Sequence, residues 1–350
     1  MYVAAGPTFC ERYWPQRKKE ALYRVEHQIS IKLLIEGYNK NMAKFRIYNI
    51  QLLPRSNEFD EVGAQGYRRL FSGFRDLNIE HLRQKTQAAF HYPLAGDSFL
   101  APDKDFKFPA GYVSGNFVRY TTADELTELR SGKTLYRAPR GQTAVSSQKE
   151  LPFVFDTKRH FLAIDGAHLP KGDVFQEALR KFLNPVAEKL FPDHSLTVNL
   201  ISRANALEDI FKRATGYRVV DVNLAFPNGP ETERLLRDLK ETKTALTIRA
   251  SGVGGDKGRM SAVPEFLKDV LRAAITYGSA RMTYFLPSPD GKKPGRWETY
   301  NSNDTPVTFS VRHSPKETDE REYFDRVAER LAAIDVHDGD DEDYQDGQDA

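Results

Sequence analysis

A glycine-rich run with two basic residues is the first feature of this sequence that could do chemistry. It spans residues 251–259, Ser-Gly-Val-Gly-Gly-Asp-Lys-Gly-Arg, between an expected strand and an expected helix. Backbone amides in such a loop can surround a phosphate, while Lys257 and Arg259 add positive charge. The run lacks the Gly-Lys-Ser/Thr ending of a P-loop and the glycine spacing of a dinucleotide fingerprint. It therefore indicates either a phosphate-contacting loop or a flexible connector.

A second basic cluster precedes the tryptophan at position 297. The run Lys-Lys-Pro-Gly-Arg-Trp fills residues 292–297, at an expected turn between two strands. Basic groups beside an aromatic ring suit a phosphate backbone with a packed base or sugar, although a solvated hairpin tip has the same composition. With the basic residues of neighbouring segments, the candidate nucleic-acid-binding set comprises Lys240, Lys243, Arg249, Lys257, Arg259, Arg272, Arg281, Lys292, Lys293, Arg296 and Trp297.

A metal-dependent nuclease is the alternative reading of the acidic residues. Asp156 and Lys158 follow an apolar strand, and Asp103 or Asp105 could supply a second carboxylate. Two carboxylates that hold Mg²⁺ beside a lysine can cleave a phosphodiester. Short acidic patterns of this kind also arise by chance in so charged a chain.

Other site chemistries receive no support from the sequence. The eight histidines have no metal-ligand spacing, no serine lies in a Gly-x-Ser-x-Gly elbow, and Cys10 is the single cysteine. We expect His160, beside a strand, to be a packed or surface histidine. No catalytic residue and no cofactor is expected, except Mg²⁺ under the nuclease alternative.

The charge of the chain is unevenly distributed. Lysine and arginine number 51 against 49 acidic residues, but residues 1–330 alone carry 51 against 41, a net charge of +10. A positive body attracts polyanions, and its acidic C-terminal end can screen it or keep it soluble. The acidic residues of that end are Asp335, Asp338, Asp340, Asp341, Glu342, Asp343, Asp346 and Asp349.

Composition and length predict a globular protein of about two domains. The 350 residues are 40% hydrophobic and 29% charged, which is enough to form a core. The sequence contains no apolar run of membrane-spanning length and no signal-peptide pattern, so we expect a cytoplasmic protein without membrane insertion.

The first 41 residues differ from the rest. Ala21–Ile35 has the spacing of a short helix, and Met42 directly precedes a clean strand at Lys44–Leu52. Two interpretations remain open. Either residues 1–41 are an extension and translation starts at Met42, or they form a docked N-terminal helix.

We expect an α+β fold with mixed sheets, helices packed on them in two layers, a C-terminal antiparallel meander and a closing helix. The expected domains are an N-terminal α+β domain at 42–148, a C-terminal α/β-type domain at 149–334 and a disordered acidic tail at 335–350. In the first domain, we expect helices at Phe59–Phe74 and Ile79–Phe90, a strand at Gly111–Tyr120 and a mobile loop at Ser131–Lys149. The expected elements of the second domain are strands at Phe153–Asp156, His160–Asp165, Leu196–Ile201, Val219–Phe226, Thr244–Ala250, Arg281–Leu286, Arg296–Tyr300 and Val307–Val311, and helices at Val174–Leu190, Ala204–Lys212, Glu231–Lys240, Val263–Ala274 and Lys316–Ala333.

Several segments of the second half resemble a known family. The segments are Phe161–Asp165, Val219–Asn223, Phe226–Gly229, the Ala250–Gly252 turn and the final meander. In layout and loose motifs they resemble the domain of unknown function 4747 family, bacterial and prophage-associated proteins met near antiviral genes, over roughly residues 42–330. That family supplies no catalytic residues to transfer. The run of strand, helix, strand and basic glycine-rich loop is also similar to the DNA-binding subunit of the lambda Rex exclusion system, which implies binding of double-stranded DNA by a homodimer.

Three functional hypotheses follow. The first is a non-enzymatic nucleic-acid-binding protein, with double-stranded DNA as the expected ligand, in a phage-defence or prophage module whose other proteins are candidate partners. The second is the metal-dependent nuclease, acting as an effector or toxin through Asp105, Asp156 and Lys158. The third is a structural or partner-binding protein whose acidic tail engages a basic partner.

Overall fold

The computed structural model describes residues 42–84, 90–123, 125–139, 144–227, 234–288, 294–313 and 319–335. The chain divides into two units, Met1–Met42 with Arg312–Thr318, and Ala43–Val311 with Asp319–Ala350. The expected helix at Ala21–Ile35, most of the acidic tail, Lys292 and Lys293 lie outside the described residues.

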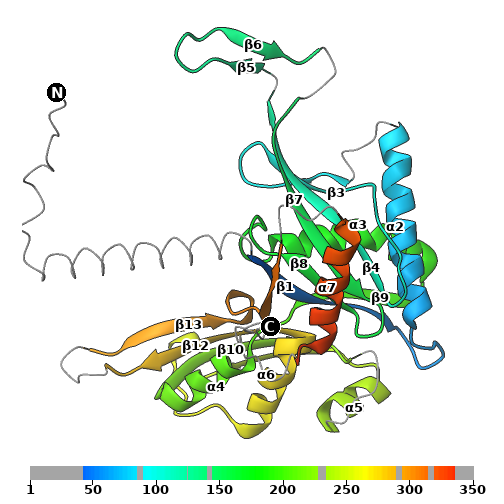
Figure 1. The fold of residues 1–350 in the computed structure, drawn as a ribbon. Coiled ribbons are helices and arrows are strands. Elements are labelled where there is room, and N and C mark those ends of the chain that lie inside the picture. The colour runs from blue at the N-terminus through cyan, green and yellow to red at the C-terminus, as the bar shows by residue number, and fades with distance from the viewer. Residues whose placement is uncertain are drawn as a thin grey trace, which may run out of the picture. The chain divides into compact units, whose positions relative to one another are not determined.

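The larger of the two main sheets has eight antiparallel strands (Figure 1). Its strands follow the order β14-β1-β8-β7-β4-β3-β2, and β9 pairs with the second half of β1. The strands are β1 (Met42–Pro54), β2 (Tyr92–Pro93), β3 (Ser98–Pro102), β4 (Tyr112–Ala123), β7 (Ala144–Asp156), β8 (Phe161–Asp165), β9 (His194–Leu200) and β14 (Thr308–Arg312).

Helices cover both faces of this sheet. On one face, α2 (Ala64–Gln84) and α3 (Val174–Leu190) bury an aromatic core that includes Phe71, Phe74, Phe153 and Phe182. On the other face, α7 (Glu320–Ala333) packs Tyr323, Phe324, Val327 and Leu331 against Phe45 and Phe309. The strands therefore carry apolar side chains on both sides, as a sheet between two helical layers requires.

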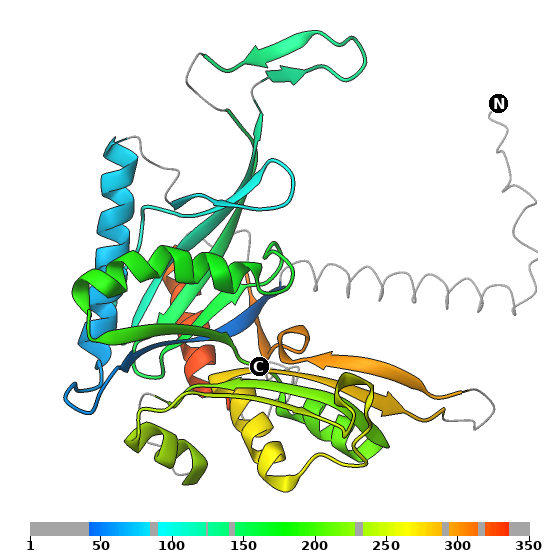
Figure 2. The same cartoon turned by 180° about the vertical axis from the view of Figure 1, so that it is seen from behind.

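A four-stranded antiparallel sheet with helices on one face completes the fold (Figure 2). Its strand order is β11-β10-β12-β13. The strands are β10 (Gly216–Leu224), β11 (Leu246–Ser251), β12 (Gly278–Leu286) and β13 (Arg296–Asn301). Its core holds alternate residues of the strands together with α4 (Ala204–Arg213), α5 (Arg234–Glu241) and α6 (Glu265–Tyr277). Two short 3-10 turns, η2 (Gly255–Lys257) and η3 (Ser302–Asp304), follow β11 and β13.

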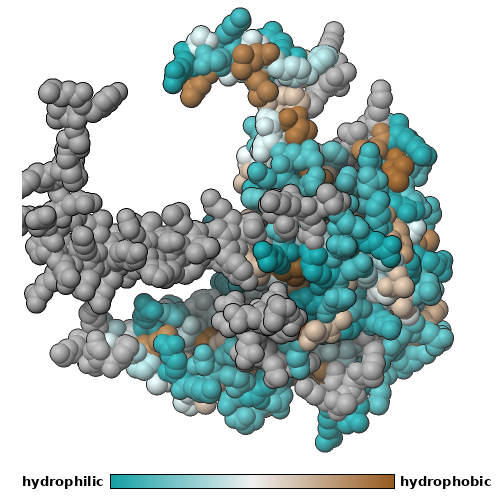
Figure 3. Space-filling view, in the orientation of Figure 1, coloured by the Kyte–Doolittle hydropathy of each residue, from teal (hydrophilic) through white to brown (hydrophobic). Residues whose placement is uncertain are grey.

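The polar segment between residues 131 and 149 contains two strands, so the expectation of one continuous loop is wrong. It contains β6 (Thr134–Arg137), paired with β5 (Glu125–Thr127), and the first half of β7, paired with β4. Side chains there are largely exposed, so no apolar alternation marks these strands in the sequence. Backbone hydrogen bonds to the paired strands hold them in place. Exposed apolar residues gather on the β5–β6 hairpin (Figure 3), namely Leu126, Leu129, Leu135 and Tyr136.

The pairing of β7 with β4 extends across the position of the expected domain boundary. The division between residues 148 and 149 falls within β7, where Gln148 faces Tyr120 and Lys149 faces Arg119 of β4. The residues on its two sides thus belong to one strand of one sheet. Continuous pairing with β4 carries the chain through this point.

The α+β class expected from the sequence is confirmed. The two helices expected at Phe59–Phe74 and Ile79–Phe90 are instead the single helix α2, because the polar Asn78 is buried and donates to Pro102 O and Asp103 O. Of the three C-terminal strands, β12 and β13 pair with each other, while β14 lies beside β1 in the larger sheet. No helix in the described part of the chain is long and apolar enough to cross a membrane.

Candidate nucleic-acid interface

The four-stranded sheet has one face that no described helix covers, which we call the outer face. Alternation along the strands sends Val220, Val222 and Met282 to the helical side, where they are buried. The residues between them lie on the outer face, and each is half-buried or exposed. The outer face comprises Val219, Asp221, Asn223, Thr247, Arg249, Ser251, Ser279, Arg281, Thr283 and Thr299.

A row of charged residues crosses the middle of the outer face. Asp221 of β10 stands in register with Arg249 of β11 and with Arg281 of β12. The Nη1 of Arg249 donates to both carboxylate oxygens of Asp221, at 2.8 and 3.0 Å. Arg281 is exposed and makes no ion pair with a described residue. Because the row contains two arginines and one carboxylate, it keeps a net positive charge.

Arginines and aromatic rings stack at one end of the outer face. Phe285 and Trp297 are cross-strand neighbours whose ring centroids lie 5.3 Å apart. The guanidinium of Arg218 lies 4.0 Å from the centroid of Trp297, and that of Arg259 lies 5.1 Å from the centroid of Phe285. Cation–π contacts of this kind hold the arginines in place. The Trp297 ring, expected from the sequence to pack against a base, is thus already in contact with Arg218 and Phe285.

The glycine-rich loop after β11 folds back on itself. Its amides Gly255 N and Gly258 N donate to Gly252 O and Gly255 O, at 3.0 and 2.9 Å. A Cβ at Gly252 would lie 2.4 Å from Arg259 N, so only glycine permits this close approach. The compact turn leaves Lys257 exposed next to the aromatic end of the sheet strands. Gly252 N also donates to Arg218 O at 3.1 Å, so these glycines have a packing role and three of the loop's amides already have partners.

Four of the predicted cations lie elsewhere. Lys240 on α5 pairs with Glu61, and the Lys243 ammonium lies 5.4 Å from the Phe226 ring centroid. Arg272 on α6 pairs with Glu208 and Asp269 on the helical side of the sheet, at 2.7 and 3.0 Å. Arg296 alternates with Trp297 and so points to the helical side, where its Nε lies 2.5 Å from Glu298.

The structure thus divides the predicted set. It brings Arg249, Arg281 and Trp297 onto the outer face, with Arg259 stacked at its end and Lys257 in the adjoining loop. Lys240, Lys243, Arg272 and Arg296 are outside this group. A single patch that contains all of the predicted basic residues does not form, because strand alternation and the helical layer separate them.

Sequence comparison places the chain in a family. The model described as Domain of unknown function (DUF4747) matches residues 43–329. The chain belongs to this family. The match covers both sheets of the described fold. No curated protein shows significant sequence similarity to the chain.

In this DUF4747 chain, the residues of the nuclease hypothesis lie in turns and connections at the ends of strands. Asp156 ends β7, and its Oδ1 accepts hydrogen bonds from Lys158 N and Arg159 N, at 2.8 and 3.2 Å. This carboxylate therefore stabilises the turn into β8. Lys158 and Asp105 are exposed, Asp105 in the connection between β3 and β4. Catalysis at these residues stays a prediction.

His160 of the DUF4747 chain is packed, as expected. It is 7% exposed, and its ring stacks on Tyr67 with centroids 4.1 Å apart. Burial lowers the pKa of His160 to about 4, although Asp156 and Glu61 act in the opposite direction. The imidazole is therefore neutral near pH 7.

The sequence analysis missed Arg218 and the hydroxyl residues of the outer face. The signal for the hydroxyl residues lies in the two-residue alternation of β11 and β12, which read Thr-x-Arg-x-Ser over 247–251 and Ser-x-Arg-x-Thr over 279–283. Both segments place an arginine between two hydroxyl residues on the same face. Arg218 gives no such signal, because a register shift between Tyr217 and Val219 turns it toward Trp297.

Proposed function

We propose that this protein binds nucleic acid, with double-stranded DNA as the expected form, through the outer face of its four-stranded sheet. The observation that carries the proposal is the crossing row of Arg249, Asp221 and Arg281 among side chains that bear hydroxyl or amide groups. Arginines and hydroxyl groups are typical partners of phosphate oxygens. The proposal includes no catalytic step.

The surroundings of Trp297 support a phosphate-contacting mode. Its ring contacts both Arg218 and Phe285, so stacking on an unpaired base would compete with those contacts. Contacts to the phosphate backbone require no such rearrangement, and a duplex presents phosphates without free bases. Lys257 and Arg259 extend the positive surface at the same end of the sheet.

The biological setting of this proposal rests on resemblance. Likeness to the Rex exclusion subunit and to proteins met near antiviral genes favours a role in a phage-defence or prophage module. The same likeness favours a homodimer, in which two outer faces would contact one duplex. The test of DNA binding depends on neither the defence role nor the homodimer.

The test neutralises three cations of the proposed interface. The variant combines Arg249→Gln, Lys257→Gln and Arg281→Gln, all at exposed positions. DNA affinity is measured over a series of salt concentrations by fluorescence anisotropy with a labelled duplex. If each cation contacts a phosphate, the slope of log affinity against log salt decreases by about three units.

A matched control removes the same charge from elsewhere. It combines Lys189→Gln, Lys212→Gln and Arg237→Gln, which are exposed on α3, α4 and α5. The control should keep most of the slope of the unmodified protein. Equal slopes for the two triple variants would exclude the outer face as the interface. A chain that binds no duplex at low salt would refute the proposed function itself.

A further inference from the structure

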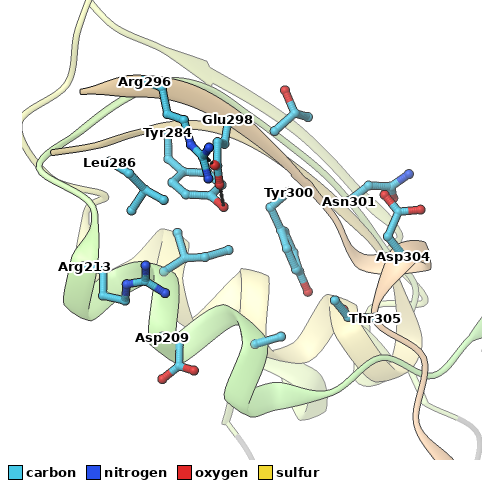
Figure 4. Close-up of a pocket in the computed structure, with 13 residues that line it drawn as sticks. Asp209, Arg213, Tyr284, Leu286, Arg296, Glu298, Tyr300, Asn301, Asp304 and Thr305 are labelled. Carbon is cyan, nitrogen blue, oxygen red and sulfur yellow. Dashed lines mark hydrogen bonds and ion pairs between the residues drawn. The ribbon is translucent and has the colours of Figure 1, made fainter. Parts of the chain in front are cut away.

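A cavity lies on the helical side of the four-stranded sheet, opposite the outer face. It has a volume of about 440 Å³ and lies between α4 and strands β12 and β13 (Figure 4). Its lining combines two tyrosines, two arginines and the three carboxylates of Asp209, Glu298 and Asp304 with apolar side chains such as Ile210 and Leu286. The volume is in the range of small-molecule sites.

Tyr300 brings an unpaired polar atom into this cavity. The residue is only 5% exposed, and its hydroxyl makes no hydrogen bond within the described part of the chain. Thr305 lies next to Tyr300 in Figure 4, and its hydroxyl donates to Ser302 O at 3.2 Å. Burial raises the pKa of Tyr300, and Thr305 partly offsets this rise. A buried hydroxyl without a partner in good hydrogen-bond geometry is costly, and a ligand hydroxyl that reached Tyr300 would remove this cost.

The two arginines of the cavity differ in their partners. Arg296 pairs with Glu298 at 2.5 Å, and the Tyr284 hydroxyl donates to the same carboxylate at 3.0 Å. Arg213, at the C-terminal end of α4, makes no ion pair with a described residue and extends beside the cavity (Figure 4). Arg213 is thus the cation available to an anionic ligand, while the carboxylates of Asp209, Glu298 and Asp304 can accept hydrogen bonds from ligand donors.

We propose that this cavity binds a nucleoside monophosphate. This ligand carries a phosphate for Arg213, sugar hydroxyls that can donate to Glu298 and pair with the Tyr300 hydroxyl, and a flat ring that can pack on Ile210 and Leu286. A simple anion would leave Glu298 and Tyr300 without a ligand partner, whereas an uncharged nucleoside would leave Arg213 without one. The cavity and the outer face use different side chains of the sheet, so neither proposal depends on the other.

The experiment titrates the full chain by calorimetry with AMP, GMP, CMP and UMP, and in parallel with the four nucleosides and inorganic phosphate. We expect saturable binding of at least one monophosphate with a Kd below about 1 mM. The nucleoside and phosphate alone should bind more weakly, because each satisfies only part of the lining. Absence of saturable binding for all four monophosphates would overturn the proposal.

Two variants locate the binding. Arg213→Gln should weaken binding of the monophosphate roughly tenfold or more and leave the nucleoside unaffected. Tyr300→Phe removes only the unpaired hydroxyl and should weaken both ligands several-fold. The matched control Lys212→Gln changes the neighbouring exposed residue of α4 and should bind as the unmodified chain does. Circular dichroism spectra establish that the variants fold.

The same titration can overturn the location. If Arg213→Gln and Tyr300→Phe both bind the monophosphate as tightly as the unmodified chain, the ligand does not occupy the cavity. If Arg281→Gln on the outer face abolishes binding while Arg213→Gln does not, the phosphate binds the outer face instead. Either result refutes the cavity as the site.

Discussion

The two sheets of this protein differ in how many of their faces are covered. The eight-stranded sheet has α2 and α3 on one side and α7 on the other, and its strands bury phenylalanines and aliphatic residues on both. The four-stranded sheet has helices on one side only, and its outer face carries arginine, aspartate, threonine and serine. The polar residues of the outer face are not needed to fill a core. Their chemistry is therefore the part of the molecule most open to a binding role.

The largest expected effect tests the structural side of this comparison. Phe153 is fully buried in the covered sheet and contacts the rings of Phe71, Phe106 and Phe117. Phe153→Ala should lower the free energy of unfolding by about 3–5 kcal/mol, because it leaves a cavity in the core. Thr299→Ala on the outer face should change it by no more than about 0.5 kcal/mol. Urea denaturation measures both changes in unfolding free energy. Similar losses for the two variants would contradict the difference between the covered sheet and the outer face.

The second effect is a pH dependence confined to the covered sheet. Burial holds the folded-state pKa of His160 at about 4, below its ordinary value of 6.5. The unfolded chain therefore binds this proton more readily, and stability is lost as the pH falls from about 6.5 to about 4. The full contribution amounts to about 3 kcal/mol.

The variant His160→Asn isolates this contribution. His160 has a φ of 63°, a left-handed conformation that asparagine tolerates better than most residues. The difference in unfolding free energy between the two proteins should change steadily between pH 7 and pH 4. If unfolding free energy depends on pH in the same way in both proteins, His160 is not the cause of the pH dependence.

The smallest effect sharpens the functional side of the comparison. Asp221→Asn on the outer face removes the carboxylate charge that pairs with Arg249 and so raises the positive charge of the row of Arg249, residue 221 and Arg281. We expect duplex DNA to bind about twofold to fivefold more tightly, because an exposed ion pair is weak and the surface gains a net positive charge. Asp238→Asn on α5 changes the net charge of the chain equally and serves as the control. Weaker binding by Asp221→Asn would mean that the carboxylate positions Arg249 for contact.

Sequence patterns predicted the elements whose side chains alternate or repeat strongly. The helix at Val174–Leu190 has the bounds that the spacing of its apolar residues predicts. Strand β7 extends well beyond its apolar end at Phe153–Asp156, because its first half forms backbone hydrogen bonds without burying its side chains. Such pairing leaves no trace in hydrophobicity.

The candidate interface was predictable only in part. Residue type alone predicted Arg249 and Arg281, but the partner of each cation depends on register and on the helical layer. Arg272 is close in sequence to Arg281, yet it pairs with Glu208 across α4 and α6. Arg296 precedes Trp297 directly but faces the other side of the sheet. Three-dimensional proximity between distant segments determined both outcomes.

Strand β1 contributes to all three hydrophobic cores. Phe45 and Ile47 enter the core under α7, Ile50 and Leu52 enter the core under α2 and α3, and Leu53 enters the core of the four-stranded sheet. Detaching this one strand would open every core together, so the two sheets should melt as a single cooperative unit. We therefore expect that neither sheet folds alone as a fragment, and that a truncated protein that carries the outer face must also include β1.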